Sequence, residues 1–190
     1  MTLLRTSSRG RASAPSGEIP RHSVVIDIAV GLFAGLVATQ VTNLTQGPLK
    51  RLTPDSVDRH EKRVRPGASS SLVAAQKTTR TLDVSLSRRE EEMWGKTIHF
   101  ATGIGWGPVY GLLRRYGGLR PVSAALGSGV AMSLILDEGL VPALGLSAPS
   151  HHYLTHTRAR GFVAHLAYGI AVGLAAEGLG RLLRRPPGRT

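Results

Sequence analysis

Residues 24–44 read VVIDIAVGLFAGLVATQVTNL, with Asp27 as the single ionisable residue. A helix of this length spans about 31 Å at roughly 1.5 Å per residue, close to the hydrocarbon thickness of about 30 Å of a bilayer. The stretch is too long for the apolar core of a secretory signal peptide, and no convincing cleavage site of small residues follows it. We therefore expect a retained signal-anchor that spans the membrane.

Three further apolar blocks follow, at about residues 94–113, 122–144 and 162–183. Charged residues lie mainly between the blocks, whereas a soluble amphipathic helix would mix polar and apolar residues within one segment. Trp94 and Tyr110 lie near the ends of the second block, where interfacial aromatic residues are common. The pattern predicts an all-α fold, in which residues 23–185 form an integral membrane bundle of four transmembrane helices.

The first two blocks are separated by residues 46–93, a polar stretch with ten basic and seven acidic residues. A connection of this length is expected to contain helices of its own. Thr-Pro-Asp at residues 53–55 is typical of a helix start, and Pro-Gly at residues 66–67 is a natural stop. A second amphipathic helix is expected from about Ser70. We therefore predict a polar, partly helical insertion.

The insertion ends in a predicted helix start. Ser87 and Glu90 have the spacing of a capping box. Acidic residues continue to Glu92, which suits the positive end of a helix dipole. This helix is expected to continue into the second apolar block.

Basic residues dominate the composition, with 24 Lys and Arg against 12 Asp and Glu and a net charge of +12. Such a charge suits nucleic acid or an anionic lipid surface, and its placement beside the apolar blocks favours lipid. We expect a bilayer with anionic headgroups as the partner, and no nucleic acid. The Arg pairs at 114–115 and 184–185 most simply anchor helix ends at the headgroups, with specific lipid recognition as the alternative.

The chain ends are also basic, and they bear on the topology. Residues 1–22 are expected to form a disordered arm, and residues 186–190 a short tail. Four spans place the arm, the 114–120 linker and the tail on one side, which the positive-inside rule assigns to the cytoplasm. The ten basic residues of the 46–93 insertion, which then lies outside, count against this assignment. We expect a multi-pass protein of the cell (inner) membrane.

Two blocks share a local pattern. Residues 99–107, HFATGIGWG, and residues 165–173, HLAYGIAVG, have His, Ala, Gly, Ile and Gly at equivalent positions. The match predicts two helix pairs related as parallel repeats. A chance likeness between two Gly- and Ala-rich segments is the alternative.

Glycines at four-residue spacing form stripes of small residues on three of the blocks. They are Gly31 and Gly35, then Gly103, Gly107 and Gly111, and finally Gly169 and Gly173. In lipid, such stripes let helix backbones approach closely. They favour packing within the bundle, and a homo-oligomer interface is the alternative. Gln40, Thr42 and Asn43 are further candidates for hydrogen bonds between helices.

Ionisable residues inside the blocks are candidates for function, because a charged side chain at mid-bilayer costs about 2.5–3.5 kcal/mol on insertion scales. The candidates are His99, Asp137, Glu138, His165 and Glu177. In the predicted topology the first four lie toward the same, non-cytoplasmic side. A cluster there could relay protons, and His99, His165 and Asp137 could bind a metal ion. A hydrogen-bonded network that fixes helix register is the simplest interpretation.

Evidence for an enzyme is lacking. The sequence has no zinc-protease motif, nucleophile elbow or phosphate-binding glycine loop, so no cofactor is expected. Cysteine is absent, which excludes a thiolate metal site. His152 and His156 would share a helical face and, with His151, could bind a metal, but histidines in exposed loops are more often not ligands.

The layout resembles the YagU-like family of small bacterial inner-membrane proteins. The resemblance rests on residues 31–35, 48–54, 142–149 and 161–168, together with His99 and His165. It implies a multi-span helical membrane protein of uncharacterised molecular function, with an association with acid tolerance. It implies no catalytic residues.

The leading hypothesis is a non-enzymatic membrane protein, structural or stress-related, whose His and carboxylate cluster senses or conducts protons. A membrane-embedded metal-binding protein or enzyme is the first alternative. A soluble, basic nucleic-acid-binding protein is the second, and it requires the apolar blocks to pack in water as one core.

Overall fold

The computed structural model describes residues 21–67 and 69–183, and every element in these ranges is helical. The elements are α1 (Arg21–Arg51), α2 (Asp55–Val64), α3 (Ser70–Thr81), α4 (Arg88–Trp106), α5 (Pro108–Arg115), α6 (Pro121–Met132), the π-helix η1 (Ser133–Leu140), α7 (Val141–Ala143), the 3₁₀-helix η2 (Ser150–His152) and α8 (Thr155–Leu183). Residues 21 and 22 of the predicted arm belong to α1, because the helix continues beyond its apolar part. The rest of the arm, Arg184, Arg185 and the predicted tail lie outside the described residues.

Three helical segments are long and apolar enough to cross a membrane: Val24–Arg51, Pro121–Ala143 and Thr155–Leu183. They correspond to the first, third and fourth predicted blocks. The second block is divided between α4 and α5, which meet at Gly107. Pro108 lacks an amide hydrogen and cannot donate the next backbone hydrogen bond of α4, so the regular helix is interrupted there. The first turns of α4 are also charged, so neither helix has the length and hydropathy of a span on its own.

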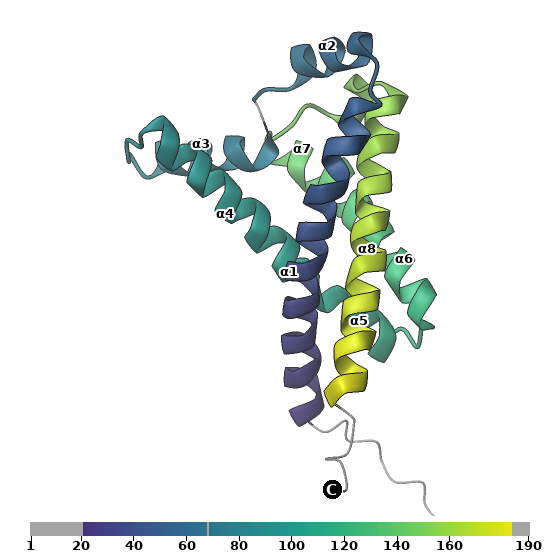
Figure 1. Ribbon diagram of the computed structural model, residues 1–190. Helices are drawn as coiled ribbons and strands as arrows, with labels where there is room; N and C mark the ends of the chain where they lie inside the picture. The colour runs from purple at the N-terminus through teal and green to yellow at the C-terminus, as the bar shows by residue number, and fades with distance from the viewer. Residues whose placement is uncertain (1–20, 68, 184–190) are drawn as a thin grey trace, which may run out of the picture.

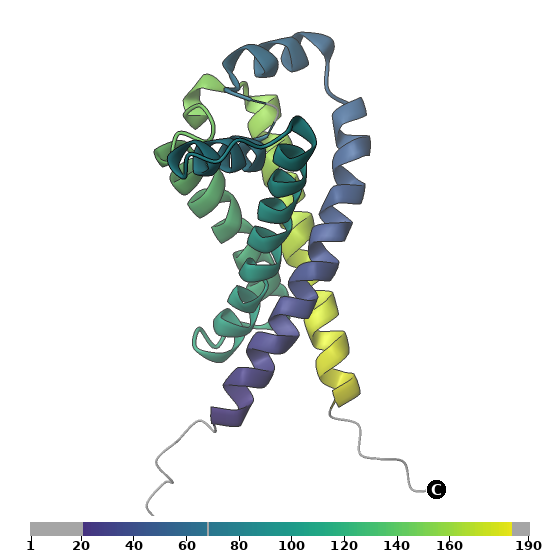
Figure 2. The same ribbon diagram turned by 90° about the vertical axis from the view of Figure 1, so that its left-hand side faces the viewer.

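The two longest helices, α1 and α8, run antiparallel along the molecule and pack against each other (Figure 1). Figure 2 shows them crossing, with the start of α1 and the end of α8 at the same end of the molecule. Helix α4 packs against α1, and α6 packs against α8. Helix α2 lies across the opposite end, and α3 packs beside α4.

Small residues fill the interior, and large apolar residues face outward. The buried residues include Ala34, Ala38, Ala124 and Ala164, with Tyr168 and Val172 as the largest fully enclosed apolar side chains. In contrast, Val122 is 70% exposed and Leu174 72% exposed. Exposing such apolar surface costs free energy in water but not in lipid. Close helix packing through small residues, with bulky residues outside, is the arrangement expected of helices in lipid.

Glycines mark the crossing of α1 and α4. A Cβ atom added at Gly31 would lie 2.6 Å from Pro108 Cα, and one at Gly35 would lie 2.7 Å from the Ile104 carbonyl oxygen. One at Gly107 would lie 2.8 Å from Gly35 Cα. These distances leave no room for a side chain, so the two backbones touch.

A second close crossing joins α6 and α8. A Cβ atom at Gly169 would lie 2.8 Å from Gly129 N, and one at Gly173 would lie 2.9 Å from Ala125 Cβ. Gly111 differs from the other predicted stripe glycines, because the nearest atoms to its added Cβ, in Asp27, are 3.8 Å away. It makes only an ordinary contact.

The predicted capping box at the start of α4 is present. Ser87 Oγ accepts a hydrogen bond from the Glu90 amide at 3.4 Å, and Glu90 Oε2 accepts one from the Ser87 amide at 2.8 Å. Hydrogen bonds from the Ser87 side chain and backbone lower the pKa of Glu90 below its usual value. The capping contribution of the ionised carboxylate is therefore present above the unfolded-state pKa and is lost as pH falls through the lowered folded-state pKa.

Replacing Ser87 with alanine is expected to lower the free energy of unfolding by about 1 kcal/mol at neutral pH. The difference from the unmodified protein should shrink in acid, where Glu90 is protonated. Denaturant unfolding in detergent micelles, followed by circular dichroism, measures both effects. Ser85→Ala, at an exposed position two residues earlier, is the control and should leave stability unchanged.

Candidate functional site

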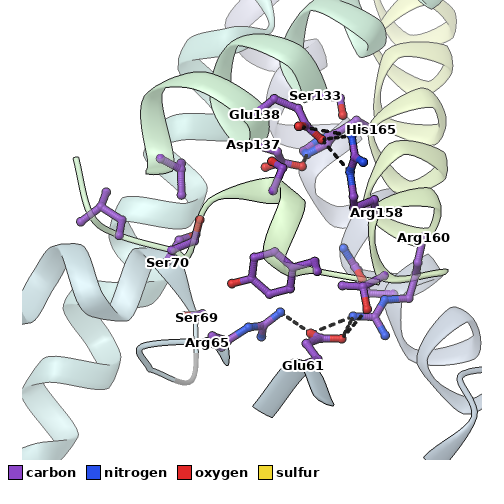
Figure 3. A pocket seen from close by; sticks show the side chains of 18 of the residues that line it. Glu61, Arg65, Ser69, Ser70, Ser133, Asp137, Glu138, Arg158, Arg160 and His165 are labelled. Carbon is purple, nitrogen blue, oxygen red and sulfur yellow. Dashed lines mark hydrogen bonds and ion pairs between the residues drawn. The ribbon is translucent and has the colours of Figure 1, made fainter. Parts of the chain in front are cut away.

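A polar cavity of about 510 Å³, whose lining is drawn in Figure 3, is bordered by residues at the end of the bundle away from the start of α1. It is bordered by the last turns of α1, by α2, by the start of α3, by η1 and by the start of α8. Its ionisable lining residues are Lys50, Glu61, Arg65, His99, Asp137, Glu138, Tyr153, Arg158, Arg160 and His165. The bundle therefore carries, at one end, a concentration of charged and titratable side chains.

The π-helix η1 supplies both predicted acidic residues. Asp137 Oδ2 lies 2.7 Å from His165 Nε2, and Glu138 Oε1 lies 3.4 Å from Arg158 Nη2 (Figure 3). Neighbouring residues point in different directions on a helix, so the two carboxylates reach different turns of α8. π-Helical segments often occur at functional sites, and this one positions the acidic pair toward α8.

His165 is the central residue of the site. With Asp137 ionised, its carboxylate only accepts hydrogen bonds, and His165 Nε2 is then the donor. The other ring nitrogen, Nδ1, is buried and has no hydrogen-bond partner among the described residues. In the neutral imidazole this nitrogen carries the lone pair. His165 can therefore accept a proton at Nδ1 while Asp137 stabilises the resulting charge.

His99 borders the same cavity but has a different partner. Its Nε2 lies 2.9 Å from Asn43 Oδ1 on α1, so Asn43 joins two helices as predicted. His99, Asp137 and His165 also line a second, inner cavity of about 180 Å³ that reaches Tyr168. Three of the four predicted cluster residues thus border both cavities, and Glu138 lines only the outer one.

The described part of the chain contains no group of three or more His, Cys, Asp or Glu residues placed to hold a metal ion. His99, His165 and Asp137 therefore do not form a three-ligand set in this structure. The loop histidines do not form one either: the rings of His151 and His152 contact each other, and His60 Nε2 lies 2.9 Å from the His152 carbonyl oxygen.

A buried ion pair lines the outer cavity, and the sequence did not reveal it. Glu61 Oε2 lies 2.7 Å from Arg160 Nη2, with the two side chains only 6% and 11% exposed. Glu61 also forms an ion pair with Arg65, and Arg160 donates to Thr53 Oγ1 at 2.9 Å. The i,i+4 spacing of Glu61 and Arg65 was the one local signal. Acidic residues in a polar insertion are usually solvated, so the pattern gave no reason to expect burial.

Glu177, the fifth candidate, lies at the other end of the bundle. It accepts hydrogen bonds from the Tyr110 hydroxyl at 2.8 Å and from Arg114 Nε at 3.1 Å. Nearby, Arg115 forms an ion pair with Asp27, the single ionisable residue of the first block. The structure thus separates these groups from the His165 site.

The geometry of the site is suited to binding and releasing a proton. It combines an imidazole, a carboxylate in contact with it, and adjoining cavities that give access. Known proteins provide no further guidance: no family model matches the chain, and no match is found among curated proteins or solved structures.

Proposed function

We propose that the protein is a multi-pass membrane protein that binds a proton at the His165–Asp137 pair and responds to the pH on the cavity side. The contact of 2.7 Å between His165 Nε2 and Asp137 Oδ2 carries the proposal. It lies within two segments of membrane-spanning length and borders a polar cavity. A histidine is the side chain whose protonation changes most readily near neutral pH.

In this proposal α4 and α5 together form a second, broken span. The chain then crosses the membrane four times, with α1 beginning and α8 ending on one side. Arg114, Arg115, Arg120 and Arg181 lie at that end, and we assign it to the cytoplasm because long, charge-mixed segments such as residues 46–93 carry less weight under the positive-inside rule. The cavity then opens to the opposite side. Location in a bacterial inner membrane and membership of the YagU-like family stay predictions.

Contacts between the helices support the two predicted parallel repeats. In each of the pairs α1/α4 and α6/α8, small residues bring the backbones together. Each pair also has a hydrogen bond from a histidine that lies four residues before a stripe glycine. His99 bonds Asn43 of α1, and His165 bonds Asp137 of η1, which directly follows α6. Of these two histidine contacts, only the one between His165 and Asp137 involves a carboxylate. The repeat thus supplies an internal comparison, in which the same contact occurs without an ionisable partner.

Asp137→Asn tests the proposal, because it gives His165 an asparagine amide as its hydrogen-bond partner, as His99 already has in Asn43. An amide cannot balance the charge of the imidazolium, so the pH response of the His165 signal should differ from that of the unmodified protein. Histidine-selective NMR of the full chain in lipid nanodiscs measures this titration. The His165 signal is assigned by its loss in His165→Gln.

Asn43→Ala is the matched control, since it removes the partner of the other histidine. It should alter the His99 signal and leave the His165 titration unchanged. If His165 titrates identically in the unmodified protein and in Asp137→Asn, the pair is only structural. A His165 signal that does not change with pH in the unmodified protein would also refute the proposal.

A further inference from the structure

A second large cavity, of about 650 Å³, lies near the other end of the bundle, between α1, α5 and α8. Figure 1 shows the three helices close together there, near the end of α8. Three arginines and two carboxylates line the cavity, together with apolar residues of α1 and α8 such as Ile26, Val30 and Leu183. The lining therefore combines apolar side chains with charged ones, and cations exceed anions among its charged residues.

Two of the arginines already neutralise the carboxylates. Arg115 pairs with Asp27, and Arg114 donates to Glu177 through Nε at 3.1 Å and to the Leu119 carbonyl through Nη1 at 2.8 Å. Arg181, in the last turn of α8, forms no ion pair with a described residue. Arg114 Nη2 likewise donates to none of them. Among the described residues, the lining thus keeps one positive charge without a counterion and guanidinium hydrogens without an acceptor.

Guanidinium groups bind phosphate oxygens through paired hydrogen bonds. Basic pockets between membrane helices on the cytoplasmic side commonly bind anionic lipid headgroups. A free phosphate would use the arginines alone, whereas a phospholipid would also cover the apolar side chains of Ile26, Val30 and Leu183 that line the cavity. The cavity therefore matches both parts of a lipid molecule.

We propose that this cavity binds the phosphate of an anionic phospholipid through Arg114 and Arg181, with an acyl chain along α1 and α8. The proposal gives these arginines a specific ligand in addition to a general anchoring role. It needs the cavity to lie at the headgroup level, as the membrane placement implies, and is independent of proton binding at His165.

Native mass spectrometry of the full chain, released from detergent containing phosphatidylglycerol or phosphatidylcholine, tests the proposal. The unmodified protein should retain phosphatidylglycerol preferentially. Arg181→Gln should weaken that binding about fivefold, which corresponds to the loss of about 1 kcal/mol per basic residue. Arg120→Gln is the matched control, because Arg120 is exposed just before α6 and does not line the cavity. It should leave binding unchanged.

Three outcomes would overturn the proposal. Equal retention of the two lipids would show that the cavity does not select an anionic headgroup. An equal loss in Arg181→Gln and Arg120→Gln would attribute binding to diffuse surface charge. Displacement of the lipid by inorganic phosphate would assign the cavity to a soluble anion.

Discussion

Leucine in place of Gly107 is expected to prevent close packing of α1 and α4 and to lower the free energy of unfolding by about 3 kcal/mol or more. A Cβ atom at this position would lie 2.8 Å from Cα and N of Gly35 and would collide with the Gly31 carbonyl oxygen. These are backbone atoms, which cannot rotate away, so the helices must separate. In lipid little hydrophobic force opposes that separation.

Gly105→Leu is the control, because no neighbouring atom lies within 4 Å of a Cβ added at Gly105. It makes an equal change in side-chain volume at an open position and should unfold like the unmodified protein. Helix α8 offers the same comparison, with Gly169→Leu at the crossing and Gly178→Leu at an open position. Unfolding in mixed detergent micelles, followed by circular dichroism, measures all four. Equal stability of Gly107→Leu and Gly105→Leu would refute the close crossing.

Local signals predicted much of the fold. Helix α2 begins one residue later than predicted, with Pro54 at its N-cap, and ends before Pro66, while α3 begins at Ser70 as predicted. Each of these residues acts on the backbone of its own turn. Three apolar blocks became long helices for the same local reason, that length and hydropathy are properties of a segment. The break at Pro108 was also visible in the sequence. It was not predicted, because the second block was defined by hydropathy alone, which takes no account of the missing amide hydrogen of Pro108.

Contacts between distant segments were harder to predict. The meeting of Asp137 with His165 followed from topology, since both lie toward the same end of neighbouring spans. The π-helix that directs Asp137 toward α8 has no local sequence signal. Glu61 and Arg160 are far apart in the chain, and nothing local to either residue specifies the other. Their pairing depends on how α2 folds back over the start of α8.

Removing the carboxylate of Glu61 should lower the free energy of unfolding much more than expected for a residue in a polar insertion. The Glu61 side chain is 6% exposed and accepts hydrogen bonds from Arg160 Nη2 at 2.7 and 3.0 Å. Glu61→Ala leaves the buried Arg160 charge without its main partner, so the free energy of unfolding should fall by about 3–5 kcal/mol. Denaturant unfolding in detergent micelles measures the loss. Asp58→Ala is the control on the same helix, since Asp58 pairs with the exposed Lys62 and should have a much smaller effect.

The double variant Glu61→Leu with Arg160→Met separates two explanations of this loss. If the cost arises from the unpaired charge, replacing both partners with apolar residues should restore most of the stability, because no buried charge remains. If the double variant is as unstable as Glu61→Ala, the pair instead holds α2 against α8 through its hydrogen bonds to Thr53 and Arg65. Recovered stability would show that the fold does not require an ion pair beside the cavity. Proton binding at His165 in that variant would then measure how far the Glu61–Arg160 charges influence the site.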